Sequence, residues 1–313
     1  MGVIRKWGDG HIKKSLKQID PNTWLLGNFI LRRSPNPSNT ATWIDTSDGS
    51  SYLLEEASTS QSCMASSPDS PYISLVHDAG DASVVWAIGS NALCKIRYIE
   101  KGVTPESVTL NYVQGQQPSF DTPKVLGHIY DKDRSYLFLQ RLPGRTLDSA
   151  WPSLTEERRT HYVNTIAAIC EEMANWTGCR LSGVDGQDIP EPYLQPNGKE
   201  GYDTIQDTCQ AIGMDCSSFV FFHADLGPSN IMVADDPRSE RLGLIDFEIS
   251  GFFPRGWVRT KFRISPGLDL SSAVTDTSPT YWRSEVQKAL EKKGFEDYSE
   301  GYMKWLQKGL SDG

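Results

Sequence analysis

The sequence predicts an α+β fold of two lobes, a small N-lobe with a five-stranded antiparallel sheet and a larger helical C-lobe. Three observations predict this arrangement. Five short runs of strand-forming residues lie between residues 72 and 140, one helical stretch follows the third run, and apolar residues recur mainly at helical spacing after residue 150. A chain of 313 residues is long enough for two such lobes.

The N-lobe is predicted from strand-forming runs that are separated by turn residues such as Asp, Gly, Ser and Asn. The five runs are 73–77, 84–88, 92–97, 125–130 and 136–140. Between the third and fourth runs, Thr104, Pro105 and Glu106 supply an N-cap, a proline at the first helical position and an acid in the first turn. They predict a helix that ends near Gly115.

The C-lobe is predicted to be mostly helical. Val163, Ile166, Cys170 and Met173 recur at the spacing of one helix face. The other elements that we expect are short buried strands at 219–222 and 242–245, and helices at 278–293 and 297–308.

Residues 1–70 are predicted to be a partly flexible N-terminal extension. The stretch from residue 31 to residue 70 is crowded with Ser, Thr, Asn and Pro, a composition that packs poorly. The apolar run at 24–31 could dock on the body. We therefore divide the chain into an extension (1–70), an N-lobe (71–142) and a helical C-lobe (143–313).

Composition excludes several classes of protein. The net charge of −9 argues against a nucleic-acid partner, which usually requires a basic surface. No apolar run is long enough to cross a membrane, and the N-terminus lacks the apolar segment of a secretory signal, so we expect a cytoplasmic protein without a membrane partner. The six cysteines form no C-x-x-C pair, which makes zinc binding improbable.

The strongest chemical signal is His223-Ala-Asp-Leu-Gly-Pro-Ser-Asn230, followed by Leu244-Ile-Asp-Phe-Glu248. An Asp and an Asn five residues apart on one loop can hold a substrate hydroxyl and a metal ion side by side. In phosphoryl transfer, Asp225 would accept the hydroxyl proton, while Asn230 and Asp246 would hold Mg²⁺ with hard oxygen ligands. Each residue alone could instead form a turn, but the combined spacing favours the functional interpretation.

Two further residues fit the same chemistry. Lys95 lies in the third predicted strand, where a kinase places its phosphate-binding lysine, and Glu106 in the next helix would be its ion-pair partner. The alternatives are a solvated lysine and an acid that is favoured by the helix dipole. The Asp78–Ser83 turn occupies the place of a phosphate-covering loop but has only Gly80, as any hairpin could.

These residues together resemble the aminoglycoside phosphotransferase and choline kinase family, in particular its fungal phosphotransferase branch. The resemblance covers roughly residues 72 to 310 and rests on five segments: Ala92-Leu-Cys-Lys95, Thr122-Pro-Lys-Val-Leu, Leu139-Gln-Arg-Leu-Pro-Gly-Arg-Thr-Leu, the His223–Asn230 segment, and Ile245-Asp-Phe-Glu-Ile-Ser-Gly. It implies a two-lobed protein-kinase-like fold with ATP and Mg²⁺ as cofactors.

By position, the resemblance makes Asp225 the catalytic base and Asn230 and Asp246 the magnesium ligands. It also implies that Lys95 contacts the α- and β-phosphates and that Glu106 orients Lys95. The segment from Leu139 to Leu142 resembles the hinge whose backbone binds adenine, which implicates Gln140 and Leu142. Two features stand out: Ala224, where the family has glycine, and Glu248, which belongs to the fungal pattern and could assist the metal or cap the loop, so that we assign it no firm role.

The predicted reaction is transfer of the γ-phosphoryl group of ATP to a hydroxyl of a small molecule. A protein kinase is disfavoured because the H-R-D and A-P-E segments are absent. A catalytically silent nucleotide-binding protein and a different reaction in the same cleft remain alternatives. Seven acids between residues 181 and 218 suggest an acceptor that carries an amine or quaternary ammonium. The alternative is a solvated acidic face on surface helices, which is what most runs of charge are.

Overall fold

The computed structural model describes residues 12–57, 70–195, 202–236, 241–271 and 278–311. Its contacts divide the chain into two compact units. The first unit is Met1–Lys101 with Pro123–Leu142, and the second is Gly102–Thr122 with Pro143–Gly313. The predicted α+β class is confirmed, with strands in the first unit and most helices in the second. The three sequence ranges that we named as extension and lobes stay a proposal.

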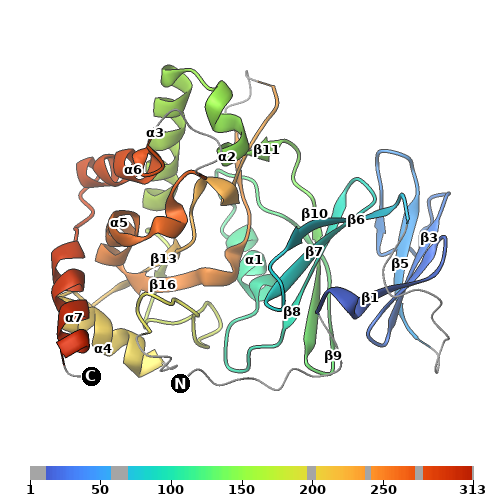
Figure 1. Ribbon diagram of the computed structural model, residues 1–313, viewed down its shortest axis with the longest axis horizontal. Helices are drawn as coiled ribbons and strands as arrows, with labels where there is room; N and C mark the ends of the chain where they lie inside the picture. Colours follow the sequence, from blue (N-terminus) through green and yellow to red (C-terminus); the bar gives the residue numbers. More distant parts are fainter. Residues whose placement is uncertain (1–11, 58–69, 196–201, 237–240, 272–277, 312–313) are drawn as a thin grey trace. The chain divides into compact units, whose positions relative to one another are not determined.

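The predicted five-stranded antiparallel sheet is present in the first unit (Figure 1). Its strands run in the order β6-β7-β8-β10-β9, so the fourth and fifth strands along the chain exchange places. Their bounds are β6 (Ile73–Asp78), β7 (Ser83–Ile88), β8 (Ala92–Tyr98), β9 (Val125–Asp131) and β10 (Arg134–Gln140). Strand β8 is central, and Lys95 on it lies opposite Val85 of β7 and Leu137 of β10.

A second five-stranded sheet, in the order β1-β2-β3-β5-β4, occupies the N-terminal part of the chain. Its strands are β1 (Leu16–Asp20), β2 (Thr23–Leu26), β3 (Phe29–Ser34), β4 (Trp43–Ile44) and β5 (Ser51–Glu56), preceded by a 3-10 turn at Ile12–Ser15. The expectation of loose segments is therefore wrong for the described residues between 31 and 57. In this range the polar residues lie mostly in the loops that connect the strands, whereas the apolar residues lie on the strands. Residues 58–69 lie outside the described part of the chain.

The two sheets share one hydrophobic core. Trp24 and Leu31 from the N-terminal sheet belong to the same buried cluster as Cys94 and Ile96 of β8. Successive strand residues point to opposite faces, so Lys95 lies on the other face of its sheet, away from this core. The predicted docking of the apolar run at 24–31 is confirmed, and it covers the face that Lys95 does not use.

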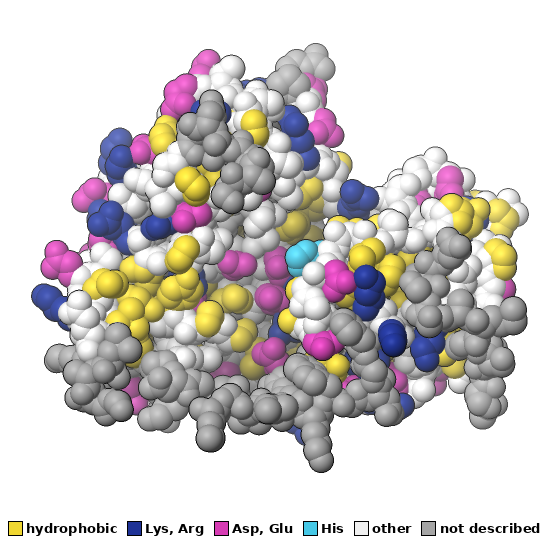
Figure 2. Space-filling model, in the orientation of Figure 1, with side chains coloured by type: hydrophobic (Ala, Val, Ile, Leu, Met, Phe, Trp, Pro, Cys, Tyr) yellow, Lys and Arg dark blue, Asp and Glu magenta, His cyan; other side chains and the backbone are white. Residues whose placement is uncertain are grey.

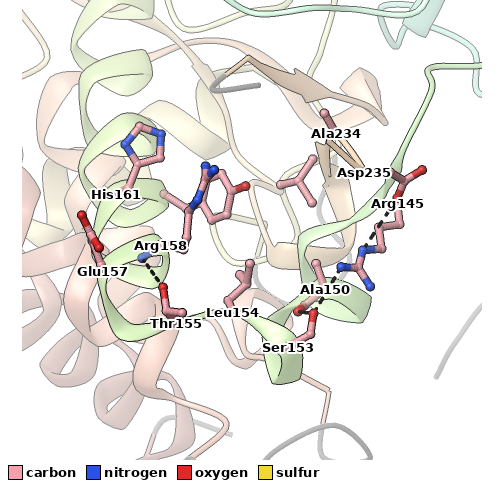
Figure 3. Close-up of a pocket in the computed structure, with 12 residues that line it drawn as sticks. Arg145, Ala150, Ser153, Leu154, Thr155, Glu157, Arg158, His161, Ala234 and Asp235 are labelled. Atoms are coloured by element: carbon pink, nitrogen blue, oxygen red, sulfur yellow. Dashed lines mark hydrogen bonds and ion pairs between the residues drawn. The ribbon is translucent and has the colours of Figure 1, made fainter. Parts of the chain in front are cut away.

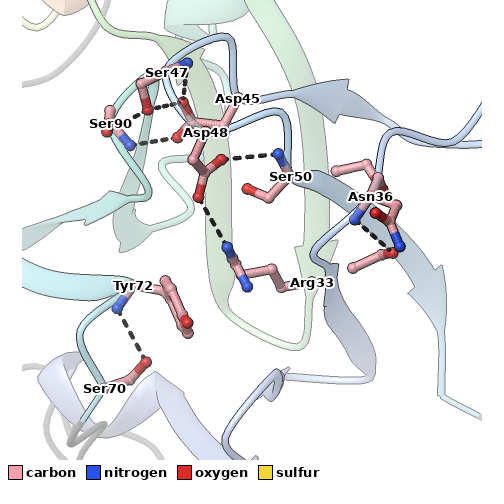
Figure 4. Close-up of polar contacts among 11 residues, drawn as sticks. Arg33, Asn36, Asp45, Ser47, Asp48, Ser50, Ser70, Tyr72 and Ser90 are labelled. Atoms are coloured by element: carbon pink, nitrogen blue, oxygen red, sulfur yellow. Dashed lines mark hydrogen bonds and ion pairs between the residues drawn. The ribbon is translucent and has the colours of Figure 1, made fainter.

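Polar contacts also tie the two sheets together (Figure 4). The buried carboxylate of Asp45 accepts hydrogen bonds from the backbone N–H of Ser90, at 2.6 Å, and from the hydroxyl and N–H of Ser47. Gly89 precedes Ser90 with a φ of +58°, and a Cβ there would lie 2.3 Å from Asp45 Oδ2. The turn between β7 and β8 therefore depends on a glycine and on an acid from the N-terminal sheet. Nearby, Arg33 pairs with Asp48 at 2.9 Å and stacks on the Tyr72 ring.

The second unit contains seven α-helices among its described residues, including the helices that the sequence predicted after residue 150. They are α1 (Glu106–Gly115), α2 (Leu147–Ala150), α3 (Glu156–Met173), α4 (Tyr202–Ile212), α5 (Arg255–Ile264), α6 (Tyr281–Lys292) and α7 (Ser299–Ser311). The expected N-cap at Thr104 is wrong. Pro105 occupies the cap position, and the Thr104 hydroxyl instead donates to Asp185 Oδ1 at 2.5 Å.

Two short three-stranded sheets in the second unit hold its loops. One has the order β11-β14-β15, formed by Arg145–Thr146, Ile231–Val233 and Leu242–Leu244. The other has the order β12-β13-β16, formed by Thr177–Gly178, Phe219–His223 and Ser250–Pro254. All residues of β13, β15 and β16 are buried. The loops that follow β13 and β15 are therefore anchored at their first residues by packed strands.

The surface and the helices add two observations. On the face shown in Figure 2, acidic and basic side chains of the described residues are interspersed. In the described part of the chain, every helix is too short or too polar to cross a membrane.

Candidate functional site

Asp225 and Asn230, which the sequence placed at the centre of the chemistry, are in direct contact. Both belong to the segment between β13 and β14, where Pro228–Asn230 forms a short 3-10 turn. The Asn230 side-chain amide donates to the backbone oxygen of Asp225 at 2.8 Å and to its carboxylate oxygen Oδ2 at 2.9 Å. These bonds hold the Asp225 carboxylate in place. They use the Asn230 side-chain nitrogen, so the Asn230 side-chain oxygen could still bind a metal ion.

The imidazole of His223 joins this loop to the next one. His223 ends β13 and is fully buried. Its Nδ1 accepts the backbone N–H of Asp225 at 3.3 Å, so the ring proton is on Nε2, which donates to the Ile245 oxygen at 2.9 Å. Burial lowers the pKa of His223 and favours this neutral form. Sequence reasoning gave His223 no role, although its place two residues before Asp225 was a usable signal.

Asp246 follows Ile245 in a conformation that few side chains adopt. Its φ of 66° and ψ of 61° are left-handed, a region where non-glycine residues are uncommon except for Asn and Asp. Burial raises the pKa of the Asp225 carboxyl, and the negative charge of Asp246 raises it further. The two predicted acids therefore lie close enough to interact electrostatically.

Glu106, the first residue of α1, also lies beside Asp246. Its buried Oε1 accepts the backbone N–H of Phe247 at 3.1 Å. Ligand oxygens of Glu106, Asp246 and Glu248 all lie within 4.8 Å of one another. Three carboxylates at this spacing fit a hard divalent cation such as Mg²⁺. The structure thus adds Glu106 and Glu248 to Asp246 as candidate metal ligands, next to the loop that carries Asn230.

Of the residues predicted to bind the nucleotide, Lys95, Gln140 and Leu142 lie in the first unit and Glu106 lies in the second. Lys95 is almost fully buried at the centre of the sheet, with 9% of its surface exposed. Because Lys95 and Glu106 belong to different units, their pairing stays a prediction. At the end of β10, the Gln140 N–H donates to the Lys124 oxygen and the Arg141 N–H to the Asn91 oxygen. Among the described residues, the Leu142 N–H has no backbone partner.

The acids that suggested a cationic acceptor have varied surroundings. Glu191 is fully buried and pairs with Lys261 of α5, with Nζ–O distances of 2.6 and 2.7 Å. Asp185 accepts the Thr104 hydroxyl. Asp188 is half-buried and Asp207 is exposed. Glu200 lies outside the described residues, as do the side chain of Asp203 and its surroundings.

Comparison with known proteins finds similarity to solved structures at low sequence identity. No protein-family model matches the chain, and no curated protein sequence matches it. Among solved structures, it is similar to an aminoglycoside-3'-phosphotransferase of type VIII, with 17% identity over 74% of this chain and 92% of that one, at a TM-score of 0.48.

Two other solved structures are similar over the same share of the chain. Aminoglycoside phosphotransferase APH(3'')-Id from Streptomyces rimosus has 13% identity, 90% of its own chain covered and a TM-score of 0.48. The gentamicin complex of APH(2'')-IIa has 14% identity, 81% of its chain covered and a TM-score of 0.46. At these identities and TM-scores, no residue role can be assigned to this chain from the similar structures. The elements described above, five antiparallel strands with one helix after the third and then a mainly helical unit, make the chain an α+β protein.

Proposed function

We propose that this protein is a phosphotransferase that moves the γ-phosphoryl group of ATP to a hydroxyl of a small molecule, with Mg²⁺ as the metal. The observation that carries the proposal is the pair of adjoining loops in the second unit. One loop fixes Asp225 through Asn230, the other presents Asp246 and Glu248, and His223 bonds to the backbone of both. A protein needs no such concentration of fixed carboxylates for stability, since buried acids reduce it unless they are paired.

Asp225 would orient the acceptor hydroxyl and take its proton. Two hydrogen bonds from Asn230 hold this residue in place, so little rearrangement is needed when the acceptor binds. A raised pKa makes the carboxylate a stronger base than an exposed aspartate. Mg²⁺ would be held by Asp246, Asn230 and Glu248, where it would neutralise charge on the phosphates.

The remaining assignments extend the proposal to the nucleotide. Lys95 would contact the α- and β-phosphates, and Glu106 would orient Lys95 or contribute to the metal site. The Leu142 N–H would bind the adenine ring, because the Gln140 and Arg141 N–H groups already have partners in the first unit. We also propose the fungal phosphotransferase branch and a cytoplasmic location.

The acceptor is proposed to carry an amine or quaternary ammonium beside its hydroxyl. Asp188 and Asp207 are the described acids of the 181–218 segment without a side-chain partner in the structure, whereas Glu191 is neutralised by Lys261. Affinity for such an acceptor should fall as ionic strength rises. Phosphorylation of neutral alcohols alone, with no dependence on salt, would exclude a cationic acceptor and leave the phosphotransferase proposal intact.

The decisive experiment uses purified full-length protein with MgATP and a panel of cationic, neutral and anionic alcohols. Mass spectrometry should find an acceptor that gains one phosphate, and Asp225→Asn protein should not produce it. The second candidate is a catalytically silent nucleotide-binding protein. Tight MgATP binding with no phosphorylated acceptor and no ATP hydrolysis would favour that candidate.

A further inference from the structure

A cavity of about 670 Å³ opens in the second unit, and Figure 3 shows residues that line it. Its wall combines the first turns of α3, the segment before that helix, and the end of β14. None of the residues that we assign to phosphoryl transfer lines it. Cavities of roughly 300–1,000 Å³ are the size of small-molecule sites.

Two basic side chains of α3 face this cavity without a partner. The guanidinium of Arg158 is half-buried and makes no hydrogen bond or ion pair with any described residue. The Nε2 atom of His161, one turn further along the helix, is shielded from solvent and likewise has no hydrogen-bond partner in the described part of the chain. Shielded polar groups are nearly always hydrogen-bonded, because an unmet group costs free energy. The His161 Nε2 atom therefore points to a ligand, and Arg158 places a cation one turn away on the same cavity wall.

The other charges of the cavity are arranged differently. Arg145 lies across from α3, where its guanidinium donates to the Ser153 hydroxyl at 3.2 Å and lies 3.9 Å from the exposed carboxylate of Asp235 (Figure 3). Asp235 thus partly neutralises Arg145. Glu157 is exposed on the first turn of α3. The arginine of the cavity that has no ion-pair partner among the described residues is consequently Arg158.

The remaining wall is apolar. Leu154, Val233, Ala234 and the buried Tyr162 line the cavity. An anion with a hydrocarbon or aromatic body would match such a wall. Its charged end would pair with Arg158, while its apolar part would be buried against the wall and removed from water.

We propose that this cavity binds a small organic anion that carries a carboxylate or phosphate group on an apolar body. Arg158 binds the anionic group through its paired N–H donors, and His161 Nε2 makes the second contact. Since Arg158 and His161 are one turn apart on the same rigid helix, both reach a single group of oxygens. The site is independent of the phosphotransferase proposal.

The test is calorimetry on the full-length protein without nucleotide, at constant ionic strength, with phenyl phosphate, benzoate and benzyl alcohol as probes. At least one of the two anions should bind, and benzyl alcohol should bind at least tenfold more weakly, because loss of a charge-assisted bond has about that effect. Comparison of phenyl phosphate with benzoate identifies which anionic group the site prefers.

Variants separate this cavity from any other anion site. Arg158→Gln should weaken binding of the preferred anion about tenfold, and Arg158→Lys should weaken it less, since it keeps the charge but loses the paired donors. Lys304→Gln is the matched control: it removes one positive charge from an exposed position on α7 and should leave binding unchanged. Unaltered binding by Arg158→Gln, or failure of both anions to bind the unmodified protein, would overturn the proposal.

Discussion

The carboxylate of Glu106 accepts a hydrogen bond from the backbone N–H of Phe247, 141 positions later in the chain, at 3.1 Å. This bond ties the first turn of α1 to the residue that follows Asp246. Phe247 is itself fully buried, so its N–H has no access to water. Glu106 therefore has a structural function that its predicted pairing with Lys95 did not include.

Two substitutions of Glu106 should separate its functions. Glu106→Gln keeps an oxygen that can accept the Phe247 N–H but removes the charge, so MgATP affinity and turnover should fall while stability stays close to that of the unmodified protein. Glu106→Ala removes both the acceptor oxygen and the charge. It should also lower the free energy of unfolding by about 1–3 kcal/mol, because the buried Phe247 N–H is left without a hydrogen-bond partner. Urea unfolding and nucleotide titration give the two readouts. Full activity of Glu106→Gln would show that the charge has no functional role.

Asp225 should be essential for turnover but not for nucleotide binding. Asp225→Ala should lower kcat by roughly 10²- to 10⁴-fold, the usual contribution of a general base. MgATP affinity should change little, because Asp225 is not assigned to the metal or the phosphates. Asp225→Asn is the control for folding, since it is nearly isosteric. A variant that keeps more than about a tenth of the normal turnover would rule out the assignment.

Asp246 should control magnesium-dependent nucleotide binding. Asp246→Asn is the preferred change, because Asn tolerates the left-handed conformation at φ 66° whereas Ala is strained there. Calorimetry should show strong loss of MgATP affinity but little change in the weak binding of metal-free ATP. Glu248→Gln should give a smaller loss in the same direction. MgATP affinity equal to that of the unmodified protein in Asp246→Asn would contradict the metal assignment.

Loss of one partner of the buried Glu191–Lys261 pair should destabilise the protein strongly, whereas loss of both should cost much less. Glu191 is fully buried, Lys261 is 3% exposed, and Trp257 and Tyr193 surround the ammonium group. Either Glu191→Gln or Lys261→Met should cost roughly 3–5 kcal/mol, because the remaining charge is buried without its partner. The double variant should recover much of this loss. Single variants that each lose less than 1 kcal/mol in urea unfolding would show that the pair is not desolvated as described.

Asp45 should make stability depend on pH in the acidic range. Burial works to raise the pKa of Asp45, but hydrogen bonds from Ser47 and Ser90 outweigh it and lower the pKa below 3.8. The unfolded chain therefore takes up this proton first as pH falls. The contribution of Asp45 is present above pH 3.8 and is lost as pH falls through the lower pKa of the folded state.

The corresponding measurement compares unmodified protein with Asp45→Ala in urea from pH 7 to pH 3. The difference in unfolding free energy should be largest at neutral pH and should shrink in the most acidic samples. Asp207→Ala, at an exposed position, provides the control. A difference that is constant over the whole range would mean that the charge of Asp45 contributes nothing.

The sequence by itself determined the local features of this protein. Alternation of β-branched and turn residues was enough to predict β6 to β10, because strand pairing between neighbours requires only short-range patterns. The contact between Asp225 and Asn230 also followed from sequence, since five residues on one tight loop leave few alternatives. Local spacing likewise placed Asp246 directly after a short buried strand.

Only the tertiary structure decided which distant groups meet. The N-terminal sheet escaped prediction because its apolar residues are separated by polar connections, and their burial requires the second sheet as a partner. Glu106 and Phe247 are joined across 141 positions, and Glu191 is neutralised by a lysine 70 positions away. The surroundings of a charge are set by such long-range contacts, and no local pattern of residues encodes them.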